Sequence, residues 1–210
     1  MKKIVVVLLL LSCFVVGFAE TGYNGVNWDT SGVSIDFNEV ETRWQITPED
    51  ELNTWSEIVL GERIIKSCCI RQNKFKGICY VINEKSVKEL LTKLDQKKKI
   101  YEIRTDFING LETSRLIAKH EKNGTLPNYS NDKKRNRSII DITAYEYSTI
   151  NAALECEYKG YKNLKKQKKS APYVGTLYIY DYNDDTRIYI TSGNVDGLAF
   201  VAYVPHAKDY

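Results

Sequence analysis

The sequence predicts an α+β fold: a mainly antiparallel β-sheet with two helices, at about residues 48–60 and 84–98, and a C-terminal three-stranded meander. Short runs of alternating apolar and polar residues recur along the chain between turn residues, which is typical of antiparallel strands. The two other stretches carry apolar residues every three or four positions after a capping sequence, which is typical of helices. Strands and helices do not alternate regularly, so the pattern favours α+β over a parallel α/β sheet.

The chain begins with a secretory signal. Lys2 and Lys3 precede an apolar run from Ile4 to Val16, and small residues lead to Ala19. This layout predicts cleavage after Ala19 and an exported, periplasmic or extracellular protein. The run is shorter than the ~20 residues of a membrane-spanning helix, so we expect no transmembrane span in the mature protein. A lipoprotein acylated at Cys13 is the alternative, because the four residues ending there resemble a bacterial lipobox.

Residues 20–210 are then expected to form a single disulfide-stabilised α+β domain. The signal removes two of the 30 basic residues, so the remaining 28 nearly balance the 27 acidic ones. Because the global field is weak, any electrostatic function must arise from local clusters.

The first helix is predicted at 48–60. Thr47 is a good N-cap, Pro48 suits the first helical position, and Gly61 ends the pattern. The apolar face would hold Leu52, Trp55 and Val59.

The second helix is predicted at 84–98, capped by Asn83 or Ser86. Its apolar face would consist of Val87, Leu90, Leu91 and Leu94.

Two hairpins are predicted around the second helix. Residues 63–70 and 78–83 form the first. Asn109-Gly110, a strong hairpin signal, would join strands 100–108 and 111–120 in the second, with a helix at 111–121 as the alternative.

A polar loop at 121–138 precedes two predicted strands, 139–147 and 150–159. A helix that starts at Ser148 also fits, because apolar residues recur there with a period near 3.6, but the strict alternation from Ile150 to Tyr158 favours a strand. The meander follows, with strands at 173–182, 186–192 and 198–204.

The cysteines are interpreted from the compartment. Without Cys13 four remain, an even number that indicates two disulfides in an exported chain. Neighbouring strand residues point to opposite faces, which disfavours a bond between the adjacent pair. Assigning Cys68 and Cys156 to the inward face predicts the bonds Cys68–Cys156 and Cys69–Cys79.

No catalytic motif is present: the chain has no Gly-x-Ser-x-Gly, no His-Glu-x-x-His and no Walker loop. The two histidines, His120 and His206, have no nucleophile beside them in the sequence. The acids available to a hydrolase are Glu157, Asp181, Asp184 and Asp185. Residues 181–187 match half of a calcium loop but lack its turning glycine and its bidentate glutamate, so we expect no metal and no cofactor.

Two surfaces are candidates for binding. A lysine-rich loop includes Lys165, Lys166, Lys168 and Lys169, and a second basic cluster is Lys133, Lys134, Arg135 and Arg137. In the meander, alternation predicts an aliphatic face of Leu177, Ile179, Ile188 and Ile190. The opposite face would carry Tyr178, Tyr180, Tyr182 and Tyr189, with Tyr203 beside them.

These observations favour an exported, non-catalytic binding or interaction protein that uses the tyrosine face and the lysine loop. A protein, a polysaccharide or an anionic envelope surface would be the partner, whereas nucleic acid is disfavoured by export. The alternatives are a small secreted hydrolase using acidic residues and a lipid-anchored structural envelope protein.

Overall fold

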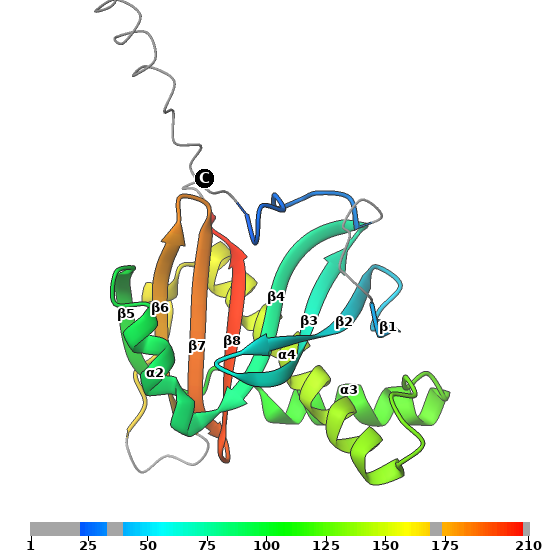
Figure 1. The fold of residues 1–210 in the computed structure, drawn as a ribbon. Helices are drawn as coiled ribbons and strands as arrows, with labels where there is room; N and C mark the ends of the chain where they lie inside the picture. The colour runs from blue at the N-terminus through cyan, green and yellow to red at the C-terminus, as the bar shows by residue number, and fades with distance from the viewer. Residues whose placement is uncertain (1–21, 33–39, 169–173, 208–210) are drawn as a thin grey trace, which may run out of the picture.

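A computed structural model describes residues 22–32, 40–168 and 174–207. They form one sheet of eight strands with helices on both sides, so the predicted α+β class is confirmed (Figure 1). The strands are β1 Thr42–Gln45, β2 Asp50–Val59, β3 Glu62–Arg71, β4 Lys74–Asn83, β5 Lys98–Thr105, β6 Gly175–Asn183, β7 Thr186–Val195 and β8 Leu198–Pro205. The helices are α2 Val87–Lys93, α3 Gly110–Asn123 and α4 Lys133–Lys159, with short 3-10 segments η2 Glu84–Ser86 and η3 Tyr161–Asn163.

The strand order is β1-β2-β3-β4-β8-β7-β6-β5, and every neighbouring pair is antiparallel. Two meanders, β1 to β4 and β6 to β8, therefore meet at the β4–β8 pair. After β4 the chain passes through α2 to β5, which is the strand at the far edge of the sheet. Helices α3 and α4 then connect β5 to its neighbour β6.

Both faces of the sheet are buried. The first face packs against α3 and α4 and includes Leu52, Cys69, Cys79, Leu177, Ile179 and Phe200. The second face packs against α2 and the segment 22–32 and includes Ile70, Ile78, Tyr80, Ile188, Ile190 and Val201. Figure 1 shows α4 crossing the sheet on the side opposite α2.

The helix predicted at 48–60 is wrong, because β2 occupies these residues. The Thr47 hydroxyl does accept hydrogen bonds from the backbone N–H groups of Glu49 and Asp50, at 3.2 and 3.0 Å. This contact closes the turn between β1 and β2 instead of starting a helix. The β-forming residues that follow alternate between the two faces, with Leu52 on the first and Trp55 on the second.

The predicted hairpin 63–83 is confirmed as β3 and β4, with a tighter turn than expected. Gln72 and Asn73 both have positive φ, 50° and 58°, so two residues suffice to reverse the chain. Asn83 then caps η2, as its side chain accepts from the Lys85 N–H. The predicted second helix is correct in place but ends early, at Lys93, because β5 begins at Lys98.

The hairpin predicted across Asn109-Gly110 is wrong, and the alternative helix is present as α3. The Asn109 side chain accepts a hydrogen bond from the Glu112 N–H at 3.3 Å and thereby caps the helix. Asparagine favours both hairpin turns and N-caps, so this dipeptide did not discriminate between them.

The two strands predicted at 139–147 and 150–159 are also wrong, because a single helix, α4, spans 133–159. Asp132 caps it by accepting from the Lys134 and Arg135 N–H groups. Residues at helical spacing face the sheet, among them Ile140, Ala144, Tyr147, Ile150 and Ala153. Tertiary packing thus overrides the strand propensity of this isoleucine-, threonine- and tyrosine-rich stretch.

The helix lies close to the sheet at Gly77 of β4. A Cβ atom at this position would stand 2.8 Å from Ile150 Cγ2, so only glycine allows this packing distance. The C-terminal meander, finally, is present as predicted in β6, β7 and β8.

Candidate functional site

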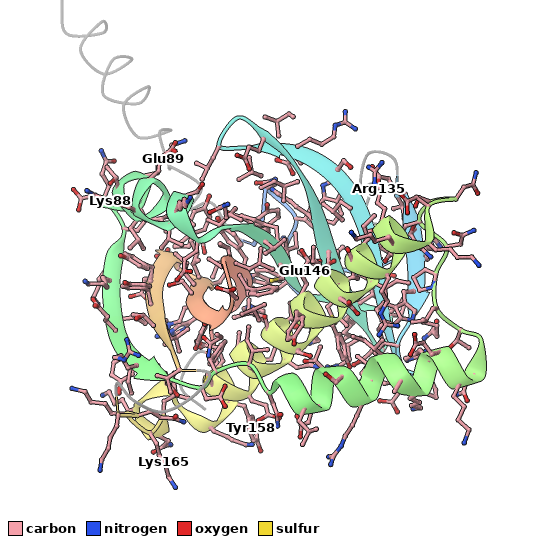
Figure 2. The ribbon with its side chains drawn as sticks, turned by 90° about the horizontal axis from the view of Figure 1, so that it is seen from below. Lys88, Glu89, Arg135, Glu146, Tyr158 and Lys165 are labelled. Carbon is pink, nitrogen blue, oxygen red and sulfur yellow. The ribbon has the colours of Figure 1, made fainter. Side chains whose placement is uncertain are left out.

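The lysine-rich segment lies beside the edge strand β5. After η3 the chain runs along β5, and the backbone N–H of Gln167 donates to the Arg104 carbonyl at 2.8 Å. Lys165, Lys166 and Lys168 are exposed, and Lys169 lies outside the described residues. In Figure 2, Lys165 and Arg135 lie at opposite ends of α4, so the two basic clusters are separate surfaces.

A groove of about 700 Å³ lies between this segment and β5. Its walls are formed by Glu102, Ile103, Arg104, Lys166, Gln167, Lys168 and Thr176. The groove therefore combines three cationic side chains with one carboxylate.

The single carboxylate is already neutralised. Glu102 accepts a hydrogen bond from Lys99 Nζ at 2.9 Å, and this carboxylate raises the pKa of Lys99. Arg104 makes one long contact, from Nη2 to the Val174 carbonyl at 3.4 Å, and its Nε is buried without a partner. Within the described part of the chain, no carboxylate forms a salt bridge with Arg104, Lys166 or Lys168. The groove thus presents positive charge that the described residues do not balance.

The predicted tyrosine face does not form as one surface. Ile179 pairs with Tyr189 across β6 and β7, and directly paired residues share a face, so Tyr189 lies on the first face with Leu177 and Ile179. Tyr178 pairs with Ile190 and lies on the second face. The predicted aliphatic face is wrong for the same reason. Leu177 and Ile179 lie on the first face of the sheet, whereas Ile188 and Ile190 lie on the second.

Two of the four tyrosines of the predicted face belong to the core. Tyr189 and Tyr180 are buried, and only Tyr178 and Tyr182 are partly exposed. The Tyr182 ring packs edge-on against the Tyr203 ring, with 5.3 Å between the ring centroids, and Lys97 Nζ lies 4.4 Å from the Tyr182 ring centroid.

The segment 22–32 covers the neighbouring aromatic residues. Tyr23 packs edge-on against Tyr203 at 4.9 Å, and buried Lys66 donates to the Tyr23 hydroxyl at 2.8 Å. Trp28 stacks on Phe75 at 4.6 Å. These aromatic side chains are therefore used to hold the N-terminal segment on the sheet.

Two of the acids suggested for a hydrolase, Glu157 and Asp181, are engaged in ion pairs. Glu157 is buried and accepts from Arg187 at 3.1 Å, from the Tyr189 hydroxyl at 2.6 Å and from the Ala207 N–H at 3.0 Å. Asp181 accepts from Arg187 at 3.2 Å. His206 also contacts Arg187. This network joins the end of α4 to the end of the chain.

The aspartate-rich turn at 181–187 has a structural use. Asp185 accepts from the Gly22 N–H at 2.8 Å, and the Thr186 hydroxyl donates to the Gly22 carbonyl at 3.0 Å. The Asn183 amide donates to the same carbonyl at 3.2 Å. The half calcium loop thus anchors the N-terminal segment, and the described residues contain no group of three or more potential metal ligands.

All four described cysteines are buried free thiols. Cys68 lies on the second face, whereas Cys69, Cys79 and Cys156 lie on the first. The predicted bond between Cys68 and Cys156 is therefore wrong, because the sheet separates them. The prediction assumed one inward face, but this sheet has two. Cys69 and Cys79 do share a face, as predicted, and burial raises the pKa of the Cys69 thiol to about 12.

His120 is a structural residue. Its Nε2 bonds the Ile46 carbonyl at 3.1 Å, and the ring packs edge-on against Trp44 at 5.2 Å. Burial lowers the pKa of the His120 imidazole. A histidine fixed in this way joins α3 to the turn between β1 and β2.

Two features were missed by the sequence reasoning. Glu146 of α4 is fully buried against the sheet, where the Ser67 hydroxyl donates to its Oε2 while its Oε1 has no partner (Figure 2). A cavity of about 730 Å³ at the β7–β8 turn is lined by three carboxylates, Glu84, Asp106 and Asp196. The acids come from distant segments, so only the fold brings them together.

The chain was compared with family models, with curated proteins and with solved structures, and none of the three comparisons found a match. Within the described residues, no helix has the length and apolarity needed to cross a membrane.

Proposed function

We propose that the protein is an exported, non-catalytic binding protein that recognises an acidic polysaccharide through the lysine segment 164–168 and the groove beside β5. The observation that carries the proposal is the set of cations in this groove, Arg104, Lys166 and Lys168, without a carboxylate partner in the described structure. Export is supported by the signal-like sequence of residues 1–19, which lie outside the described residues.

The shape of the site favours a chain over a flat membrane surface. The groove is lined by β5, by Thr176 of β6 and by the lysine segment, so a polymer can lie along it. A peripheral membrane site combines basic residues with apolar anchors. The large exposed hydrophobic residues of the described chain are Ile58, Leu111 and Tyr158, and none of them lines the groove.

Charge reversal tests the site. The variant K165E/K166E/K168E of the mature chain should bind heparin, a soluble acidic polysaccharide, at least about tenfold more weakly, because each lysine near a polyanion contributes on the order of 1 kcal/mol. The matched control is K133E/K134E/R135E, which makes the same charge change at the other end of α4. Equal losses in both variants, or no loss in the first, would contradict the proposal.

Export has its own test. N-terminal sequencing of the mature protein should start at Glu20, and a lipid-modified Cys13 would instead support the lipoprotein alternative.

A further inference from the structure

Arg104 has an unusual position in the groove. It lies on the edge strand β5, opposite Thr176 of β6, and its Nε is shielded from solvent without any acceptor. A buried donor that makes no hydrogen bond is costly, and proteins seldom retain one without a use. Its remaining described contact, to the Val174 carbonyl at 3.4 Å, is long.

The lysines are arranged to act with it. The backbone N–H of Gln167 donates to the Arg104 carbonyl, which holds the two neighbouring lysines beside Arg104. Lys166 and Lys168 both line the groove, and Thr176 adds a hydroxyl to the same wall. The groove therefore offers one planar guanidinium, two mobile ammonium groups and a hydroxyl.

We propose that Arg104, Lys166 and Lys168 form a subsite for a phosphate monoester group, carried by a sugar unit of the anionic polymer. The assignment rests on the proposed function of the groove. A guanidinium binds two oxygens of an oxyanion side by side, whereas lysines act as point charges around it. Three cations without a counter-ion match a phosphate monoester, with close to two negative charges and three acceptor oxygens, better than a carboxylate with one charge.

The experiment is calorimetric titration of the mature chain with inorganic phosphate, glucose 6-phosphate and acetate at one ionic strength. Both phosphate compounds should bind, with acetate at least about tenfold weaker. Arg104→Lys keeps the positive charge but loses the two-pronged guanidinium, so it should weaken phosphate binding about tenfold. Lys166→Gln, an exposed change that the fold tolerates, should weaken phosphate binding by a few fold.

Three results would overturn the subsite. They are acetate binding as tightly as phosphate, Arg104→Lys binding phosphate as the parent does, and glucose 6-phosphate being excluded while inorganic phosphate binds. Thermal unfolding of each variant verifies that the chain is folded. If the heparin test of the charge-reversed lysine segment also fails, the proposed function fails with the subsite. If heparin binding passes and phosphate recognition fails, only the subsite is wrong.

Discussion

Glu146 should make the stability of the protein depend on pH. The carboxyl group is fully buried, and burial raises its pKa well above the ordinary value, while the hydrogen bond from Ser67 opposes this only in part. Because Oε1 has no partner, the structure accommodates the protonated form better than the charged form. The folded state thus holds a proton that the unfolded chain releases above its pKa of about 4.3.

The sign and size of the effect follow. A raised pKa in the folded state means that stability is present at low pH and is lost as pH rises, by up to about 1.4 kcal/mol per pH unit. Glu146→Gln keeps the shape and has no proton to lose. Between pH 5 and pH 7, the free energy of unfolding of the parent should therefore fall by roughly 2–3 kcal/mol relative to this variant while Glu146 stays protonated in the folded state.

Urea unfolding of both proteins at the two pH values measures this difference. Glu155→Gln, an exposed change on the same helix, is the control and should show no comparable shift. A gap between the parent and Glu146→Gln that stays the same at pH 5 and pH 7 would refute the reasoning, since Glu146 would then be ionised in the fold.

Three further predictions concern packing and thiols. Gly77→Ala should destabilise the protein by about 1–3 kcal/mol in urea unfolding, since the added Cβ would crowd Ile150. The double variant with Ile150→Ala should lose less stability than the sum of the losses in the two single variants. Fully additive losses would argue against the contact. Asn109→Ala should cost about 1 kcal/mol through loss of the cap of α3, and an unchanged midpoint would contradict that role. The thiols of Cys68, Cys69, Cys79 and Cys156 should resist iodoacetamide in the native state and all react in denaturant, whereas two or fewer reactive thiols among them after denaturation would reveal a disulfide.

The strands that follow tight turns could be predicted from the sequence. The hairpin at 63–83 and the C-terminal meander have local signals, because turn residues separate runs of β-forming residues. Their positions do not depend on what covers the sheet. The position of the lysine segment beside β5, by contrast, depends on the path of the whole chain.

The helix α4 illustrates why the rest could not be predicted. Its residues are strong strand formers, and the alternation at Ile150, Ala152, Leu154 and Cys156 matched a strand as well as a helix. Packing against the sheet favours the helix. As a helix, these residues cover the first face of the sheet, and Ile150 packs closely against Gly77 of β4. Tyr158, which a strand at 150–159 would place on the same side as Leu154 and Cys156, is instead exposed near the end of the helix.

The candidate site was predicted in part. Lys165, Lys166 and Lys168 were recognised as a cluster, but Arg104 was not, because it lies about 60 residues earlier and only the hydrogen bond from Gln167 brings the segment to it. The faces of the tyrosines and cysteines depend on strand register and on a sheet with two buried sides. A single inward direction, assumed from alternation, does not exist in such a sheet.

The most direct test of the account is the affinity of residues 20–210 for heparin, measured at two salt concentrations for the parent sequence and for K165E/K166E/K168E. The parent should bind, and its affinity should fall as salt rises, because the contact is electrostatic. The variant should bind at least about tenfold more weakly at low salt and show a smaller salt dependence. Equal affinity and equal salt dependence in the two proteins would contradict the claim that the groove beside β5 is the binding site.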